Sequence, residues 1–136
     1  MSVIDLVEVH EFTFAAKNLY LKGAGAHASI TYVKGASTLL TKYAVVISTR
    51  DGARGEYVPL WGGTKPALAQ TLSLAPLLLG RNPDHREQIY DDLKRELRQY
   101  DHFGHGPIDI ALWDLAGKKF GASISQLLGG YRSRLK

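Results

Sequence analysis

The chain has 136 residues, no cysteine and a formal net charge of +4. That length is enough for one domain with its own core, and the lack of cysteine excludes disulfides, thiolate metal sites and cysteine nucleophiles. No apolar run approaches the roughly 18 residues of a membrane span, and the opening "MSVIDLVEVHEF" does not resemble a signal peptide. A cysteine-free chain of this kind fits a reducing compartment, so we expect a cytoplasmic protein.

The positive charge is modest, with 17 Lys and Arg against 13 Asp and Glu, and part of it lies in the terminal "YRSRLK". A nucleic-acid-binding domain is expected to show a basic stripe with interleaved aromatic residues. The sequence shows no such stripe. Nucleic-acid binding through the basic tail is therefore the weakest of the functions considered below.

The first half of the chain has the patterns of strands and loops. Apolar and polar residues alternate from Leu6 in "SVIDLVEVHEFTF", which predicts a strand. Residues 15–36 are rich in Gly and Ala and keep no clear period, so we expect a long loop. A strand through Tyr43 and Ile47, the turn Asp51-Gly52 and a short strand through Tyr57 then predict a hairpin.

The second half is helical in pattern. The first helix is expected to start at Thr64 and stop at Gly80, with Leu68, Leu72, Ala75 and Leu79 on one face. The second is expected to start at Asp84, with Glu87 completing a capping box. Its apolar stripe is predicted to be Ile89, Leu93, Leu97 and Tyr100, and its solvent face Arg86, Asp91, Lys94 and Arg98.

The third helix should run from Pro107 to Gly121, followed by a short helix capped by Ser123 and Gln126 and ended by a double glycine. Strands followed by helices, without a βαβ repeat, indicate an α+β domain.

Two aspartates interrupt the apolar third helix "PIDIALWDLAGKKF". Asp109 and Asp114 are five residues apart, about 140° around a helix, so they do not converge easily on one reacting atom. Asp109 is expected in the first turn and Lys118 and Lys119 in the last, where each complements the helix dipole. We interpret the helix as a packing element between two layers, the second of which could be another domain or subunit. If Asp114 is buried it needs a partner, such as a backbone amide or an arginine of that missing layer.

This region also carries a resemblance. "GPIDIALWDLAGKKFGASISQLLGG" resembles the "AIDIALWDLxGKxxGxPxxxLLGG" segment that ends the N-terminal capping domain of the enolase superfamily, in its mandelate racemase and muconate-lactonizing branch. "RDGARGEYVP" resembles the family's "xDGxxGxGE" hairpin, and "LLLGRNPDHREQIYDDL" its "LxGxDPxxxExxxxxL" segment. Pro107 and the pair Ala122-Ser123 depart from the pattern.

The resemblance implies a three-stranded antiparallel meander followed by a bundle of three to four helices. Residues 1–130 would be the capping domain and 131–136 the start of a linker to a (β/α)₈-like barrel of about 250 residues. It implies a parent enzyme, a dehydratase, epimerase, racemase or cycloisomerase, that removes a proton next to a substrate carboxylate. Mg²⁺ and the catalytic bases would lie in the barrel, so this chain would hold no catalytic residue and no metal ligand.

In that family two capping-domain loops select the substrate, and they correspond to the irregular segments after the first strand and after the hairpin. The residues that could contact a small carboxylate substrate, possibly an acid sugar, are Tyr20, Lys22, His27 and Tyr32 in the first and Tyr57 and Trp61 in the second. Each has a plainer interpretation: His27 and Lys22 as solvated surface residues, Tyr20 and Tyr32 as loop anchors, and Trp61 as core.

Two alternatives remain open from the sequence. The chain could be an autonomous, non-catalytic binding or assembly module with the same fold, which would be self-sufficient without a large exposed apolar patch on its third helix. The enzyme interpretation expects the barrel to pack on residues 107–120 and the protein to be a homo-oligomer. His102 and His105 have the spacing of a helical metal pair but precede Pro107 in a glycine-containing linker and lack a third ligand.

Overall fold

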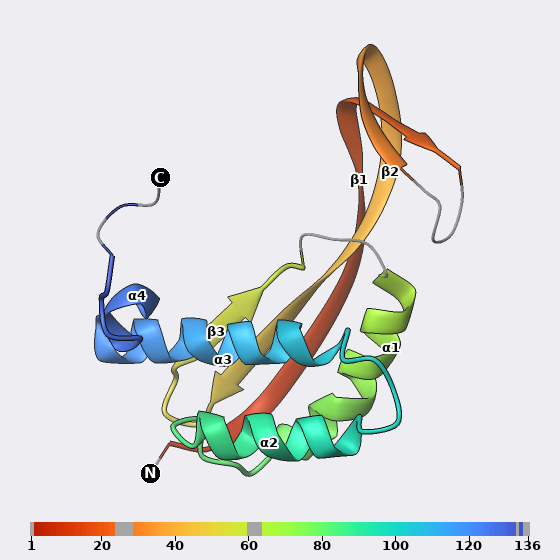
Figure 1. Cartoon of the computed structure of the whole chain (residues 1–136). Helices are drawn as coiled ribbons and strands as arrows, with labels where there is room; N and C mark the ends of the chain where they lie inside the picture. The colour runs from red at the N-terminus through yellow and green to blue at the C-terminus, as the bar shows by residue number, and fades with distance from the viewer. Residues whose placement is uncertain (1, 24–28, 60–63, 133, 135–136) are drawn as a thin grey trace.

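The computed structural model describes residues 2–23, 29–59, 64–132 and 134. Three antiparallel strands come first, β1 (Ile4–Lys22), β2 (Ser29–Thr49) and β3 (Arg54–Tyr57), in the sheet order β1-β2-β3. The helices follow: α1 (Thr64–Leu74), the 3₁₀ helix η2 (Ala75–Leu78), α2 (Arg86–Glu96), α3 (His105–Phe120) and the short α4 (Ile124–Leu127). The predicted α+β class, with its three-stranded meander followed by helices, is confirmed (Figure 1).

The core lies between one face of the sheet and the helices. Period-two alternation places Tyr43, Val45 and Ile47 of β2 on that face, all at most 1% exposed. The helices supply the other half of the same cluster, with Leu74, Leu78, Ile89, Leu93, Ile108, Ala111, Leu112 and Leu115. The predicted apolar face of the third helix and most of the stripe of the second are thereby confirmed.

The hairpin turn between β2 and β3 is also as predicted. Gly52 has a φ of +88° and donates its N–H to the carbonyl of Thr49 over 2.8 Å. The Asp51 carboxylate accepts from the hydroxyls of Thr49 and Ser2, at 2.5 and 3.0 Å, and these bonds hold the pKa of Asp51 below its usual value.

The predicted loop over residues 15–36 is wrong, because most of it is β-structure. β1 runs on to Lys22 and β2 starts at Ser29, so together they form a long ribbon that projects from the body and turns over at its far end (Figure 1). Gly and Ala dominate the composition, but "LYLK" and "SITY" alternate apolar and polar residues. Cross-strand pairing stabilises these short alternating stretches once the partner strand is in place.

The buried face of the first helix also differs from the prediction. The positions that enter the core are Ala67, Thr71, Leu74 and Leu78, while Leu72 and Leu79 are 52% and 51% exposed. "TLSLAPLLLG" offers several apolar faces of similar strength, and the contact with Tyr43 selects one: its hydroxyl lies 3.1 Å from that of Thr71. Burial raises the pKa of Tyr43.

The next two helices each start two residues away from the predicted position. α2 begins at Arg86 without a side-chain cap, so the predicted capping box is wrong; Asp84 instead pairs with Lys119 over 2.6 Å. Tyr100 lies beyond α2 and is 67% exposed. Because α3 begins at His105, Asp109 lies in the second turn and not in the first, where no acidic residue is found.

The ends of α3 and α4 follow the local rules. Gly121 closes α3 in the left-handed conformation, and Ser123 and Gln126 form the predicted reciprocal capping box of α4. No helix of the described residues is long and apolar enough to cross a membrane.

Candidate functional site

A bulge divides the β1–β2 ribbon into a proximal and a distal ladder. Lys17 pairs with Ser37, but the next pair is Leu19 with Tyr32, so one residue of β1 faces four of β2. Asn18 sits in the bulge with a φ of +59°, and its side-chain oxygen accepts from the N–H of Gly35 over 2.9 Å. Asparagine is one of the few residues that adopts a positive φ readily, so this position suits the bulge.

The distal ladder has a polar face and an apolar face. Directly opposed residues of an antiparallel pair project to the same side. Tyr20 opposite Thr31 and Lys22 opposite Ser29 form one face, which we call the polar hairpin face. The other face, which we call the apolar hairpin face, consists of Leu19, Leu21, Ile30 and Tyr32.

The six residues selected from the sequence separate accordingly. Tyr20 and Lys22 lie side by side on the polar hairpin face, and Tyr32, 69% exposed, lies on the opposite one. Tyr57 is half-buried on β3 and packs against the core cluster, so part of its ring serves packing. His27 and Trp61 lie outside the described residues.

Ser29 and Thr31 were not selected from the sequence, although both are exposed beside Tyr20 and Lys22. The signal that could have found them is the alternation in "SITY", which puts its two hydroxyl residues on one side of a strand. The Gly- and Ala-rich surroundings obscured that alternation.

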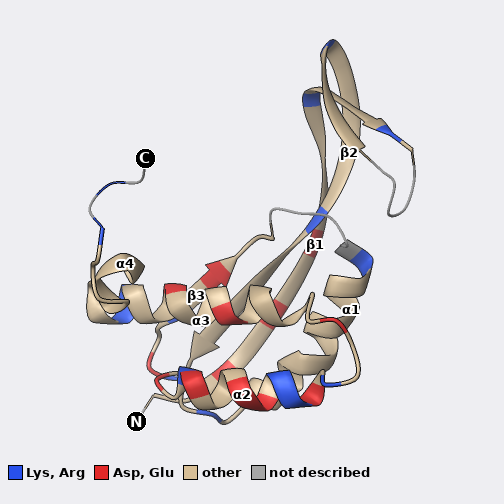
Figure 2. Cartoon of the chain, in the orientation of Figure 1, with Lys and Arg blue, Asp and Glu red and all other residues tan. Residues whose placement is uncertain are grey.

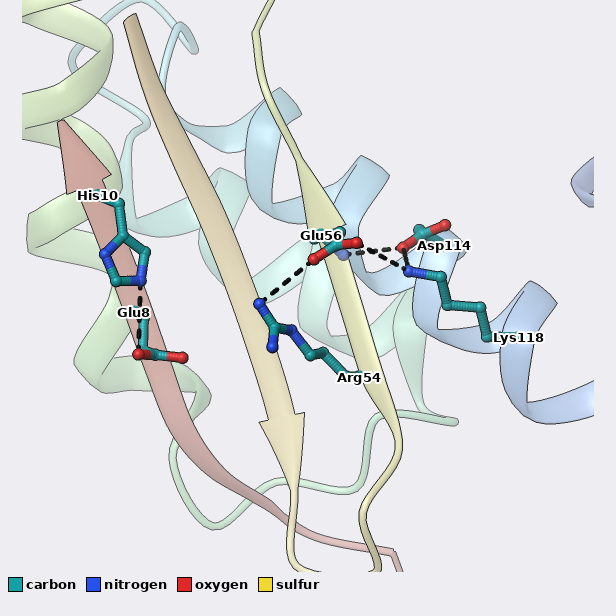
Figure 3. A network of polar contacts seen from close by, with 6 residues as sticks. All are labelled: Glu8, His10, Arg54, Glu56, Asp114 and Lys118. Atoms are coloured by element: carbon teal, nitrogen blue, oxygen red, sulfur yellow. Dashed lines mark hydrogen bonds and ion pairs between the residues drawn. The ribbon is translucent and has the colours of Figure 1, made fainter. Parts of the chain in front are cut away.

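A polar network fastens the edge strand β3 to α3 (Figure 3). The N–H of Glu56 donates to Asp114 Oδ2 over 2.8 Å, and Lys118 Nζ lies 2.7 Å from the same oxygen. Lys118 also reaches Glu56 Oε1 at 3.4 Å, and its bond with Asp114 raises the pKa of the Lys118 ammonium. The expected backbone-amide partner of Asp114 is therefore confirmed.

The second aspartate of α3 has a different environment. Asp109 is half-buried near Arg86 and Glu87 of α2, and burial, with Glu87, raises the pKa of its carboxyl. Asp109 and Asp114 thus interact with different elements, which agrees with a structural role for each and not with a catalytic pair.

Arg86 does not face solvent as predicted. Its guanidinium lies 4.5 Å from the ring centroid of Trp113, and its Nε and Nη1 are buried without a hydrogen-bond partner among the described residues. The stacking explains the misprediction, because an arginine can cover an aromatic ring with its planar group. An arginine at the start of a helix is not favoured by the helix dipole, so this contact outweighs a local preference.

Part of α3 stays uncovered on the side away from the sheet. Ile110 is 38% and Phe120 53% exposed, and Trp113 is half-buried between them. The neighbouring α4 adds Ile124 and Leu128, 37% and 65% exposed. We call these five residues the outer apolar stripe.

The described residues do not fit a divalent metal ion. They contain no group of three or more His, Asp or Glu side chains that could hold one. His105 is buried against Tyr90, with ring centroids 4.4 Å apart, and the ring of His102 lies 6.2 Å away. Burial lowers the pKa of His105, which favours the neutral form of this packed imidazole.

Comparison with known proteins gives consistent similarities. Residues 23–129 match the family model of the mandelate racemase / muconate lactonizing enzyme N-terminal domain. The chain is 38% identical over 91 residues to D-galactarolactone cycloisomerase of Agrobacterium fabrum, covering 63% of this chain and 24% of that protein. It is 32% identical over 108 residues to L-talarate/galactarate dehydratase of Salmonella typhimurium, covering 71% of this chain and 27% of that protein.

The fold has close counterparts among solved structures. Crystalline D-glucarate dehydratase from Agrobacterium tumefaciens, complexed with magnesium, superimposes with a TM-score of 0.73 at 23% identity, covering 96% of this chain and 33% of that one. The chain thus spans about a quarter of the length of the curated relatives it matches. The family model covers most of the chain and the fold agrees with it, so this chain belongs to the family of mandelate racemase / muconate lactonizing enzyme N-terminal domains.

Proposed function

We propose that this chain is the substrate-selecting capping domain of a Mg²⁺-dependent enolase-superfamily enzyme. The observation that carries the proposal is the family match over residues 23–129, with relatives named D-galactarolactone cycloisomerase and L-talarate/galactarate dehydratase. The reaction would begin with removal of a proton next to a substrate carboxylate. The substrate would be a small carboxylate, and we propose an acid sugar.

Residues 1–130 would form the capping domain and residues 131–136 the start of the linker to the barrel. The chain spans only about a third of the related solved structure, and barrel enzymes carry their chemistry at the C-terminal ends of the barrel strands. We therefore assign the catalytic bases and the Mg²⁺ ligands to the barrel, and none to this chain. What these residues would do is bind the substrate, orient it and exclude water.

The outer apolar stripe would be the surface that receives the barrel. Exposed apolar patches of this kind mark interaction surfaces, and the stripe lies on the part of α3 that the sheet does not cover. Arg86 lies at its border with two buried nitrogen atoms that lack partners, and an acceptor on the incoming surface would compensate for their burial. A homo-oligomer of the whole protein and a cytoplasmic location complete the proposal.

The first experiment is to sequence the source locus beyond the codon for Lys136, express the complete reading frame and assay it with acid sugars, with Mg²⁺ and then with EDTA. Turnover that EDTA abolishes supports the proposal. A stop codon directly after Lys136, with a chain that stays monomeric, contradicts it. That outcome favours the autonomous, non-catalytic module instead.

A further inference from the structure

The sheet has a second face that points away from the helices. Opposed residues of an antiparallel pair project to the same side, and alternate residues of a strand project to opposite sides. We call this second surface the outer sheet face. It consists of the even-numbered residues of β1 from Leu6 to Phe14, those of β2 from Leu40 to Ser48, and Arg54 and Glu56 of β3. Figure 3 looks onto this face, with the helices behind the strands, and no helix among the described residues covers it (Figure 1).

The outer sheet face is more apolar than a face that only meets water. Leu6, Phe12 and Phe14 are 49%, 40% and 42% exposed, and the two phenyl rings form one surface, with centroids 6.1 Å apart. Val46, in the middle of the face, is 3% exposed although it does not belong to the core cluster. An antiparallel sheet with one side in water normally presents polar residues there, so this exposed apolar surface indicates a contact with another body.

The charges on the outer sheet face lie in two separate rows. Near the body, Glu8 and Glu56 flank Val46 in one row across the three strands. Lys42 lies opposite Phe12, four positions further along the ladder toward the projecting ribbon, whose other charged side chains are also basic (Figure 2). The row of His10 and Ala44 lies midway between these two. The face therefore has a negative and a positive row at equal distances from its centre.

We propose that the outer sheet face binds the same face of a second copy of the protein, through a two-fold axis that crosses the strands at His10. The rotation places each row over the row equally far on the other side of the axis. Lys42 of one copy then lies over Val46 of the other, between its two glutamates. An ammonium has three donors, so Lys42 can serve these carboxylates besides groups of its own chain.

The apolar residues agree with this arrangement. The same rotation sets Phe14 of one copy over Leu6 of the other, so both exposed ends of the apolar surface are covered. A two-fold axis parallel to the strands would instead set Glu8 against Glu56 of the second copy, and like charges in contact disfavour that alternative. The charge pattern thus selects the antiparallel arrangement.

This inference rests on the homo-oligomer of the proposed function and names its surface. The outer apolar stripe lies on the side of α3 away from the sheet, so a barrel on the stripe would leave the outer sheet face free. From Leu6 to Phe14 the face spans only about 27 Å at roughly 3.4 Å per residue. It is small for a permanent dimer, so we expect association that depends on concentration.

The experiment measures the dimer dissociation constant of the complete protein by analytical ultracentrifugation over a wide concentration range. Lys42→Glu and Glu8→Lys each bring like charges together, and the double variant exchanges them. Within one chain these two positions lie about 14 Å apart along the ladder, so a rescue in the double variant must arise between copies. Lys17→Glu is the matched control, because Lys17 is exposed on the other side of the same ladder.

We expect each single variant to raise the Kd about tenfold, since the symmetry repeats each charge pair and one exposed pair changes an equilibrium about threefold. The double variant should return to within about threefold of wild type, and Lys17→Glu should stay within about twofold. A protein that is monomeric at every concentration, single variants that associate like wild type, or a double variant as weak as the singles overturns the inference.

A cross-link tests the arrangement directly, whatever the size of the assembly. The photoreactive variant Phe14→p-benzoylphenylalanine is irradiated in a mixture of ¹⁴N- and ¹⁵N-labelled copies. Cross-links should join the two kinds of copy at the peptide that contains Leu6. A cross-link to the barrel, or only within one copy, overturns the inference.

Activity separates this inference from the proposed function. A complete protein that turns over an acid sugar as a monomer overturns the inference while the proposed enzyme stands. A protein that associates as expected but converts no acid sugar supports the inference and contradicts the proposed enzyme.

Discussion

Replacing Gly55 by alanine tests the close approach of β3 to α3. Gly55 is the second residue of β3 and is buried against α3. A Cβ at this position would lie 2.1 Å from the carbonyl oxygen of Ala111 and 2.5 Å from the backbone nitrogen of Leu115. Ordinary contact begins at 3.4 Å, and the obstructing atoms belong to the helix backbone, so no side-chain rotation can relieve the clash.

β3 would have to move away from α3 by about 1 Å, with loss of dispersion contacts on both sides. Overpacking a core costs about 1–3 kcal/mol, and occasionally more; because backbone atoms obstruct here, we expect Gly55→Ala to lower the free energy of unfolding by about 3 kcal/mol. That is a large part of the roughly 5–15 kcal/mol of a typical domain, and it corresponds to a fall in Tm of roughly 10 °C.

The assay is urea and thermal unfolding followed by circular dichroism, with Gly106→Ala as the control. Gly106 lies within α3, and a Cβ there meets nothing within 4 Å, so alanine should be neutral or stabilise the helix by up to about 1 kcal/mol. If the free energy of unfolding of Gly55→Ala lies within about 0.5 kcal/mol of the wild-type value, the close approach of β3 and α3 is refuted.

Three further substitutions test separate contacts. Asp114→Ala should lower the free energy of unfolding by about 1–2 kcal/mol, because the Glu56 amide loses its acceptor, while Asp114→Asn, which keeps an acceptor, should lose less in the same urea titration. Burial lowers the pKa of His105 in the folded state, so the unfolded chain binds more protons below about pH 6.5 and the free energy of unfolding should fall as the pH drops through that range. When His105→Phe is unfolded between pH 8 and pH 5, its free energy of unfolding should fall less. An unchanged pH dependence would contradict the assignment. Asn18→Val removes the acceptor for the Gly35 amide and disfavours the positive φ, so hydrogen exchange of the distal ladder should accelerate while the proximal ladder is unaffected, and Asn18→Asp should restore protection.

The candidate site was only half predictable from the sequence. The sequence pointed to the segment between the first two strands, and Tyr20 and Lys22 do share a face. The separation of Tyr32 from them could not be predicted, because it depends on register: the bulge at Asn18 sets Leu19 opposite Tyr32, and a shift of one residue would reverse every side chain. Register across a bulge is decided by contacts between strands, not by the composition of either one.

Features set by near neighbours in the chain were determined by the sequence itself. The Asp51-Gly52 turn, the capping box of Ser123 and Gln126 and the left-handed Gly121 all appear as predicted, since each involves residues within about four positions and none of them is drawn to a distant partner. The capping box predicted at Asp84 is the exception, because Asp84 pairs with Lys119 instead. The resemblance of the segment after Pro107 to the family pattern was likewise visible in the sequence alone.

Features that join distant segments were decided only by the tertiary structure. The extension of β1 to Lys22 and of β2 back to Ser29, the contact of Gly55 with α3 and the stacking of Arg86 on Trp113 each bring together residues far apart in the chain. Local propensity for these positions is weak or points elsewhere, and the free energy gained by pairing and burial exceeds it. Long-range contacts of this kind become favourable only when the rest of the fold has already brought the partners together.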